Sequence, residues 1–181
     1  VLLLDVFEAS RDWAQARRLG ESQLKTALAA TVSPTSKAKA DKIKARLANY
    51  CCEAAEDLEA KKSWALAREE AAEGLRWDDT SIWPHLIMAR IDVEEGALKQ
   101  AFNRLLAAAT VAPSRIPEFI DVFRTVCDAL GYRSRLISLV SGFLGDRDDP
   151  QLRALLAEEY LADGRDAQAL EIIVEGLDQK P

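Results

Sequence analysis

The sequence predicts an all-α protein, a solenoid of antiparallel helix pairs, and three observations lead to this prediction. Small or apolar residues recur at one position of a helix pair, at Ala67, Ala101, Leu136 and Ala169, with spacings of 34, 35 and 33 residues. Several of the 8 glycines and 6 prolines stand at expected helix boundaries. Runs of β-branched residues with period-two alternation, which would indicate strands, are absent from the sequence.

The period indicates which helical solenoid to expect. A repeat of about 34 residues is typical of the tetratricopeptide repeat, whose unit is one helix pair. We therefore expect a single right-handed tetratricopeptide-repeat array in which each unit buries its apolar face on its neighbours. About five units are expected, at residues 1–30, 36–79, 80–113, 114–148 and 149–181.

The first two units are less regular than the later ones. Trp13 and Trp64 each stand three residues before the small residue of their unit, which is Ala16 or Ala67. The 51 residues between these alanines exceed one period by about half a repeat. We place the extra residues in the stretch from Ala30 to Asp41, as a loop or as an extension of the following helix.

In the later units, capping residues, proline and glycine indicate where helices begin and end. In residues 80–113, Ser81 is a candidate N-cap, Pro84 fits a first helical turn, and Gly96 separates two helices. Gly131 and Gly164 take the same place between helices in the next two units. Glycine in each late turn therefore supports the helix-pair interpretation.

The charge balance and the apolar runs argue against two classes of protein. Lys and Arg total 24 against 30 for Asp and Glu, and the formal charge of −6 argues against general nucleic-acid binding, which needs a basic field. No run approaches the ~18 apolar residues of a membrane-spanning helix. The chain starts without an initiator methionine, so we expect it to be a fragment of a longer protein.

Catalysis and metal binding are not predicted by any motif. Cys51, Cys52 and Cys127 lack Cys-x-x-Cys spacing, so we expect buried free thiols and no metal or cofactor in these residues. His85, the only histidine, we interpret as a surface or groove residue. The pair Asp148-Asp149 is better explained by a helix N-terminus than by metal binding. We therefore expect the protein not to be an enzyme.

The first helices of the pairs carry the predicted partner-binding surface, because in tetratricopeptide arrays these helices line the concave groove. Eight of its twelve residues are acidic and one is basic, which would attract a basic segment of a protein, although a solvated acidic face explains the pattern equally well. Trp83 and Arg90 are of the types enriched among binding hot spots. The twelve residues are Asp5, Glu8, Asn49, Glu56, Glu59, Trp83, Arg90, Glu118, Asp121, Thr125, Asp128 and Glu158.

A basic stretch lies in the first part of the second of these helices. Its side chains Lys37, Lys39, Lys42, Lys44 and Arg46 would present a positive face to anionic lipid or to an acidic partner. A solvated helix face is the interpretation that we favour.

The order of several motifs carries a family resemblance. These motifs are residues 3–7 (LLDVF), 12–16 (DWAQA), 47–55 (LANYCCEAA), the stretch 116–144 and the closing QKP at 179–181. In this order the chain resembles the tetratricopeptide region of lipopolysaccharide assembly protein B, a bacterial inner-membrane regulator.

The resemblance implies a function and partners. It implies an adaptor at the cytoplasmic face of the inner membrane that promotes proteolysis of the lipid A pathway deacetylase by an FtsH-type membrane protease. Its partners would be that protease, the deacetylase and other lipopolysaccharide assembly proteins, with a dimer possible and no nucleic acid. The family's membrane helix and its rubredoxin-like metal domain would lie outside these residues. The alternative is a generic tetratricopeptide peptide-binding or co-chaperone module.

Overall fold

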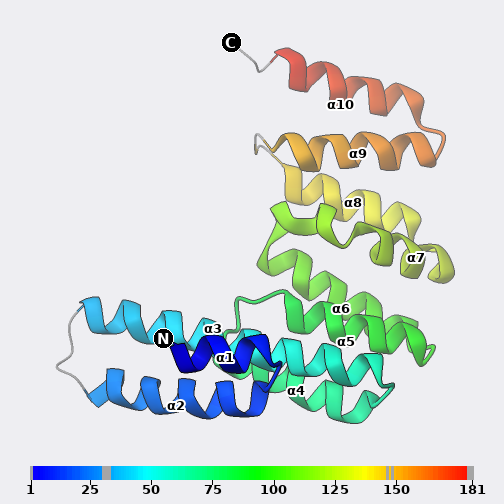
Figure 1. Ribbon diagram of the computed structural model, residues 1–181. Helices are drawn as coiled ribbons and strands as arrows, with labels where there is room; N and C mark the ends of the chain where they lie inside the picture. The colour runs from blue at the N-terminus through cyan, green and yellow to red at the C-terminus, as the bar shows by residue number, and fades with distance from the viewer. Residues whose placement is uncertain (1, 30–33, 146, 148, 179–181) are drawn as a thin grey trace. The chain divides into compact units, whose positions relative to one another are not determined.

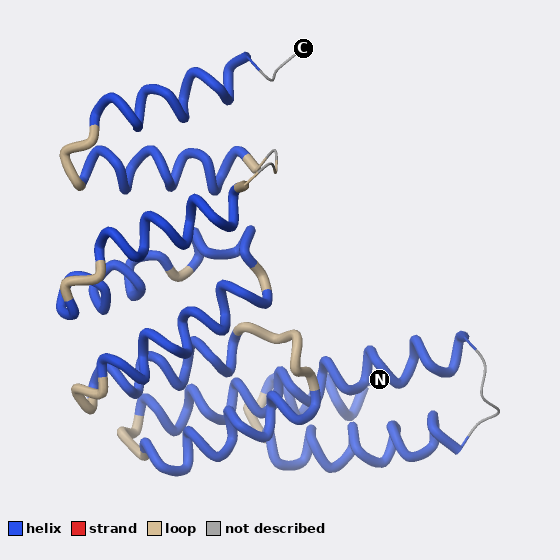
Figure 2. The backbone as a smooth tube through the Cα atoms, turned by 180° about the vertical axis from the view of Figure 1, so that it is seen from behind, coloured by secondary structure: helices blue, strands red, loops and turns tan. Residues whose placement is uncertain are grey.

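The computed structural model describes residues 2–29, 34–145, 147 and 149–178, and within these residues every regular element is a helix (Figures 1 and 2). The all-α prediction is therefore confirmed. The first five helices are α1 (Leu2–Ala9), α2 (Trp13–Ala29), α3 (Pro34–Ala60), α4 (Trp64–Trp77) and α5 (Trp83–Glu94). The others are α6 (Leu98–Val111), the 3₁₀ helix η1 (Pro113–Glu118), α7 (Ile120–Leu130), α8 (Arg133–Leu144), α9 (Pro150–Ala162) and α10 (Asp166–Asp178).

The helices form antiparallel pairs with the predicted period. The second helices of the last four pairs begin at Trp64, Leu98, Arg133 and Asp166, so they repeat the spacings of 34, 35 and 33 residues. The fourth residue of the second helix is buried in all five pairs. These residues are Ala16, Ala67, Ala101, Leu136 and Ala169. Helix pairs with this period are tetratricopeptide-type pairs.

The five turns that join the two helices of a pair share one backbone conformation. Each contains a residue with positive φ five positions before the buried small or apolar residue of its second helix, and these residues are Arg11, Lys62, Gly96, Gly131 and Gly164. The next backbone N–H donates to the carbonyl five residues earlier, at 2.7–2.9 Å, which is the Schellman closure of a helix. Glycine adopts positive φ without steric cost, whereas the arginine and the lysine are strained by roughly 1–2 kcal/mol each.

The extra half repeat lengthens two helices. α2 has 17 residues and α3 has 27, whereas the helices from α4 onward have 11 to 14. Of the stretch from Ala30 to Asp41, residues 30–33 lie outside the described residues and the remainder forms the first turns of α3. Pro34 opens α3, where its missing N–H costs no helical hydrogen bond.

The chain divides into two compact units, residues 1–91 and 92–181. Unit 1 has one apolar cluster where Leu4, Ala16 and Leu47 join α1, α2 and α3, and a second where Ala55, Ala67 and Ile87 join α3, α4 and α5. In unit 2, Phe102 of α6 packs edge-on against Phe123 of α7 and Tyr132, with ring centroids 5.6 and 5.3 Å apart. Each unit therefore has a core of its own.

The three cysteines are buried free thiols, as predicted. Burial raises the pKa of Cys52 to about 12 and that of Cys127 to about 12, because a thiolate is poorly solvated among apolar side chains. Asp149 accepts hydrogen bonds from the backbone N–H groups of Gln151 and Leu152 and so caps α9, again as predicted. Its neighbour Asp148 lies outside the described residues.

Candidate functional site

The twelve residues of the predicted surface all lie on the first helices of the pairs or on η1. Unit 1 holds Asp5 and Glu8 on α1, Asn49, Glu56 and Glu59 on α3, and Trp83 and Arg90 on α5. Unit 2 holds Glu118 on η1, Asp121, Thr125 and Asp128 on α7, and Glu158 on α9. Within each unit the structure joins several of them through arginines.

Four residues of unit 1 form what we call the Arg90 cluster: Glu56, Glu59, Trp83 and Arg90. Arg90 donates through Nη2 to Glu56 at 2.9 Å and to Glu59 at 2.7 Å, and through Nε to Glu59 at 2.9 Å. Trp83 donates its indole N–H to Glu56 at 2.9 Å. Glu56 and Glu59 lie one turn apart on α3, and their donors Trp83 and Arg90 lie two turns apart on α5. Both acceptors are therefore on one face of α3, and both donors are on one face of α5.

The Arg90 cluster is partly exposed and fixed in geometry. The exposed fraction of the side chain is 36% for Arg90, 34% for Glu56 and 17% for Glu59. Hydrogen bonding to Glu59 raises the pKa of Arg90, so the guanidinium stays charged. Two carboxylates and one cation leave the cluster with an excess of negative charge and with unused acceptor positions on the carboxylates.

The other predicted residues of unit 1 are less connected. Glu8 accepts a hydrogen bond from the Tyr50 hydroxyl at 2.5 Å and lies 3.9 Å from Arg46. Asp5 and Asn49 are exposed. These three residues of α1 and the middle of α3 therefore do not form a second cluster of predicted residues.

Unit 2 contains a deeper ionic group, which we call the Arg124 cluster: Asp121, Arg124, Arg133, Glu158 and Glu159. Arg124 donates to Glu159, to Glu158 at 3.0 Å and to Asp121 at 3.4 Å. Arg133 lies 3.7 Å from Glu159, whose side chain is completely buried. Arg133 also binds Asp128 at 2.8 Å. The cluster thus surrounds a buried carboxylate with two guanidinium groups.

The sequence prediction missed Arg124, Arg133 and Glu159. A usable signal was present, because Arg124 stands 34 residues before Glu158, one repeat away, as Arg90 stands 34 residues after Glu56. A search for opposite charges separated by one period would have found both pairs.

Arginines neutralise much of the predicted acidic surface. Besides the two clusters, Arg115 binds Glu118 at 2.7 Å, and this hydrogen bond lowers the pKa of Glu118. Seven of the eight predicted acidic residues lie within 4.0 Å of an arginine nitrogen, and Asp5 is the exception among the ion pairs of the described residues. The surface is therefore a pattern of alternating charge rather than a uniformly acidic one.

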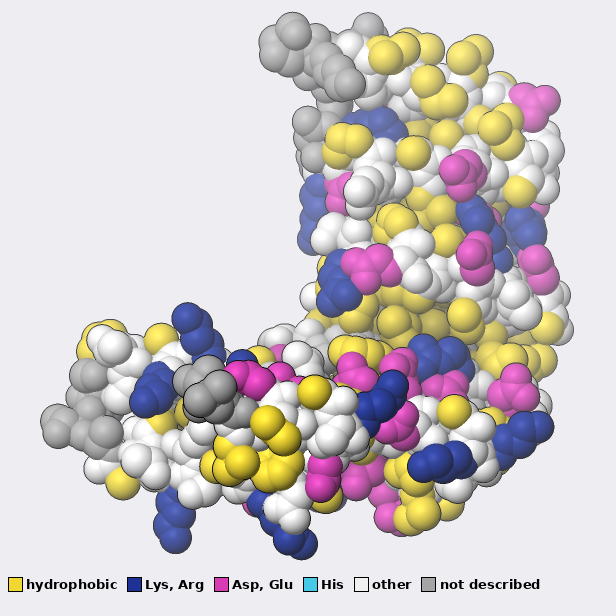
Figure 3. All heavy atoms as spheres, viewed as in Figure 1, with side chains coloured by type: hydrophobic (Ala, Val, Ile, Leu, Met, Phe, Trp, Pro, Cys, Tyr) yellow, Lys and Arg dark blue, Asp and Glu magenta, His cyan; other side chains and the backbone are white. Residues whose placement is uncertain are grey.

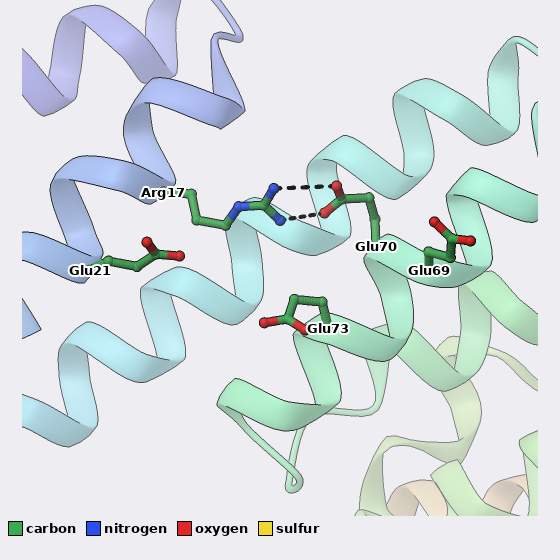
Figure 4. Close-up of a pocket in the computed structure, with 5 residues that line it drawn as sticks. All are labelled: Arg17, Glu21, Glu69, Glu70 and Glu73. Carbon is green, nitrogen blue, oxygen red and sulfur yellow. Dashed lines mark hydrogen bonds and ion pairs between the residues drawn. The ribbon is translucent and has the colours of Figure 1, made fainter.

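An acidic hollow that the sequence prediction did not include lies on the second helices of unit 1 (Figure 4). Its volume is about 360 Å³, and Arg17 and Glu21 of α2 line it together with Glu69, Glu70 and Glu73 of α4. Arg17 binds Glu70 at 2.6 Å. Glu73 in turn pairs with Arg76 at 2.7 Å, outside the lining residues. Four carboxylates around one guanidinium make the hollow more acidic than either cluster.

The basic stretch from Lys37 to Arg46 lies on the first half of α3. Lys37, Lys39 and Lys42 are exposed, as either a solvated face or a positive face for a partner requires. Across the part of the chain that the structure describes, no helix is long and apolar enough to span a membrane. Among the same residues, no group of three or more His, Cys, Asp or Glu side chains is placed so that it could hold a metal ion.

Comparison with known proteins gave structural likenesses alone. No protein-family model matches the chain, and no curated protein matches it either. The chain is similar to the crystal structure of MamA at 14% identity, with 97% of this chain and 92% of that chain covered and a TM-score of 0.48. It is similar to TTC0263, a thermophilic TPR protein in Thermus thermophilus, at 21% identity, with coverage of 100% and 90% and a TM-score of 0.45.

Proposed function

We propose that this chain is a non-catalytic adaptor that binds protein partners, and that the Arg90 cluster is part of its recognition surface. The observation that supports this most directly is the hydrogen-bonded set of Trp83 and Arg90 on two carboxylates. Tryptophan and arginine are enriched among residues that dominate binding energy. Stacked helix pairs also provide the extended surfaces that repeat proteins use for binding.

The geometry of the cluster favours binding in two ways. Hydrogen bonds already hold both anchor side chains, so a partner would immobilise few further rotamers when it binds. The carboxylates of Glu56 and Glu59 keep lone pairs that Arg90 and Trp83 do not use. A lysine or arginine of the partner would pair with these oxygens without displacing Arg90. A basic segment of a protein is therefore the preferred ligand.

The family resemblance extends this proposal to named partners. The motif order at residues 3–7, 12–16 and 47–55 supports a role like that of lipopolysaccharide assembly protein B. In this proposal the chain works at the cytoplasmic face of the bacterial inner membrane. It brings the lipid A pathway deacetylase to an FtsH-type protease and so limits lipopolysaccharide synthesis.

A pull-down with purified deacetylase and protease tests both parts of the proposal, which are the recognition surface at the Arg90 cluster and the role in lipopolysaccharide synthesis. Wild-type protein should retain at least one of the two, and the double change Trp83→Ala with Arg90→Ala should reduce capture about tenfold or more, as for a hot spot. Lys99→Ala, which removes an exposed cation on α6, is the matched control and should bind like wild type.

Different results would contradict the lipopolysaccharide role and the assignment of the Arg90 cluster as the recognition surface. If neither protein is retained but basic peptides bind, the proposed lipopolysaccharide role is wrong and a generic peptide-binding module remains. Undiminished capture by the double variant would show that the Arg90 cluster is not the recognition surface.

A further inference from the structure

The extra half repeat lengthens α2 and α3, and the added turns are basic. We call residues 21–29 of α2 and 34–46 of α3 the α2–α3 extension. It holds six Lys and Arg residues against two acidic residues, whereas the whole chain has a formal charge of −6. Figure 3 shows Lys and Arg side chains gathered over the end of α2 and the start of α3. The extension therefore differs in charge from the rest of the chain.

The lysines of the extension are available to a ligand. To the ion pairs of the described residues the extension contributes Arg46, 3.9 Å from Glu8, and none of its five lysines. Four of these lysines are exposed and Lys44 is half-buried. A lysine outside any ion pair keeps three N–H donors for water or for an anion. These lysines thus differ from Arg90 and Arg124, which carboxylates of the chain already hold.

A hollow of about 240 Å³ lies between the two helices of the extension. Its lining includes Ala27 and Leu28 of α2 and Ala40 of α3, with Lys37 and Lys44 beside them. Ala27 and Ala40 are buried and form its floor, whereas Leu28 is 62% exposed and stands at its rim. Their spacing places Lys37, Ala40 and Lys44 on one face of α3. A solvated face explains exposed lysines, but it does not explain an apolar hollow between two of them.

The size of the hollow suits a single side chain. An apolar cavity of roughly 150 Å³ in another protein holds a benzene ring. The larger hollow of the extension, about 240 Å³, therefore has room for a phenylalanine or leucine side chain. Such a side chain would remove the surfaces of Ala27, Leu28 and Ala40 from water, which favours binding.

The charges around the hollow indicate what flanks that side chain. Lys37 and Lys44 lie two turns apart along α3, and one carboxylate, that of Asp41, lies between them in the sequence and also lines the hollow. The next hollow along α3 shares Lys44 and carries Asp78 and Asp79 at the end of α4. An acidic segment would therefore extend from Lys44 toward Lys37 and away from α4.

We propose that the α2–α3 extension docks an acidic segment of a protein partner. One apolar side chain of this segment enters the hollow, and its carboxylates pair with Lys37 and Lys44. The Arg90 cluster, to which we assign a basic segment, consists of other residues. The two proposals are therefore independent.

The composition of the extension favours a protein over an anionic membrane. Helices that lie in a membrane interface carry Trp, Phe or Leu along one apolar face. The extension has no aromatic residue, and Leu28 is its one strongly exposed large hydrophobic residue among the described residues. Its apolar surface is recessed between lysines, where a side chain can enter but a flat lipid surface cannot.

A second copy of this chain fits the hollow less well than an acidic partner does. In a twofold contact centred on the hollow, Lys37 and Lys44 of one copy would face the same lysines of the other. Like charges placed together disfavour that arrangement. Self-association through this site would need another, acidic surface of the copy, and sedimentation detects it.

The test uses wild-type protein and three fluorescein-labelled peptides. The first has one phenylalanine between glutamates, the second has alanine in place of the phenylalanine, and the third has lysines in place of the glutamates. Fluorescence anisotropy should show binding of the first peptide. The second should bind about tenfold or more weakly, the effect of losing one buried apolar side chain. The third should also bind at least tenfold more weakly, because its charge matches that of the extension.

Protein variants locate the binding site. The double change Lys37→Glu with Lys44→Glu should weaken the first peptide at least tenfold. The matched control Lys61→Glu with Lys99→Glu makes the same change in net charge at two exposed lysines outside the extension, and it should leave the affinity close to that of wild type. Circular dichroism of both variants excludes unfolding as the cause.

Several results would overturn the proposal. Equal affinity for the first two peptides would show that no side chain enters the hollow, and equal affinity for the first and third would remove the role of charge. An equal loss in the two double variants would show that net charge alone matters. Failure of the acidic peptide to bind, with binding to vesicles of phosphatidylcholine and phosphatidylserine that Lys37→Glu with Lys44→Glu abolishes, would assign the extension to a membrane. A wild-type dimer that this double change converts to monomer in analytical ultracentrifugation would assign it to a second copy.

Discussion

Arg90 in unit 1 and Arg124 in unit 2 each bind a glutamate that lies 34 residues away in the sequence, yet their surroundings differ. Arg90 pairs with Glu56, 34 residues earlier, and Arg124 pairs with Glu158, 34 residues later. Arg90 binds carboxylates that are partly exposed, whereas Arg124 also binds Glu159, which is fully buried. An arginine paired with a glutamate one period away therefore belongs to an accessible surface in unit 1, whereas in unit 2 it also binds a buried carboxylate.

The difference follows from the cost of burying charge. A buried carboxylate without partners is unfavourable by several kcal/mol, so Glu159 depends on Arg124 and Arg133. Glu56 and Glu59 retain access to water, so Arg90 contributes less to stability and remains available to a partner. We infer that the Arg124 cluster stabilises unit 2 and that the Arg90 cluster is suited to recognition.

The largest expected effect is that of Arg124→Ala. Removing this partner leaves the Glu159 carboxylate buried with Arg133 3.7 Å away, and we expect the free energy of unfolding to fall by about 3 kcal/mol. Urea denaturation followed by circular dichroism measures the loss. Adding Glu159→Leu should restore part of the stability, because the buried charge is then gone. A single variant as stable as wild type would contradict the structural role of this cluster.

Substitutions in the turns should have the next largest effect on the free energy of unfolding, and its sign should differ between Lys62 in unit 1 and Gly164 in unit 2. Lys62→Gly should raise the free energy of unfolding by about 1 kcal/mol, because glycine relieves the strain of positive φ. Gly164→Ala should lower it by about 1 kcal/mol, since a Cβ there meets no neighbour and strains the backbone alone. Thermal melts of both variants suffice, and shifts of equal sign would show that φ does not govern these turns.

Arg90→Ala should affect the free energy of unfolding less than Arg124→Ala or the substitutions in the turns. We expect a loss of under about 1 kcal/mol, because the ion pairs it removes are partly exposed and screened by water. The same urea denaturation applies, with Lys99→Ala as the surface control. A loss as large as that of Arg124→Ala would remove the distinction between the two clusters.

The smallest expected effect on stability comes from charge reversal at two surfaces. Glu118→Lys with Asp121→Lys changes predicted residues of unit 2, and Glu69→Lys with Glu73→Lys changes the acidic hollow of unit 1. Each pair should alter stability by about 0.5 kcal/mol or less per site.

Association kinetics show which of these two surfaces contributes more to the electrostatic attraction of a basic partner toward the protein. Stopped-flow measurements at low and high salt compare the association rates of the two reversed proteins. We expect the hollow reversal to reduce the salt dependence more, because fewer arginines neutralise its carboxylates. The opposite order would favour the surface predicted on η1 and α7.

The helix pairs could be predicted because they depend on local and periodic signals. Ala67, Ala101 and Ala169 mark buried positions, and Gly96, Gly131 and Gly164 mark turns that need positive φ. The first two turns carry the same conformation on Arg11 and Lys62, which no glycine signal announces. η1 was not expected either, and Pro117 explains it, because proline removes the N–H that a continuous α-helix would use.

The site could be predicted only in part, because ion pairing depends on how neighbouring helices are aligned. All twelve residues lie on the first helices or on η1, as the helix-pair assignment required. Which of them are neutralised follows from contacts across helices, such as those of Arg90 with Glu59 and of Arg124 with Glu159. The hollow was missed because the prediction considered the first helices alone, whereas Arg17 and Glu70 lie on second helices.

The most direct test of the separation between the two clusters compares Arg90→Lys with Arg124→Lys. Lysine keeps the charge but loses the bidentate geometry of the guanidinium. For each variant, the melting temperature and the capture of the deacetylase and the protease are measured together. We predict that Arg90→Lys weakens capture with little change in melting temperature, and that Arg124→Lys lowers the melting temperature while the folded protein binds like wild type. Unchanged capture by Arg90→Lys together with a lowered melting temperature would contradict the account.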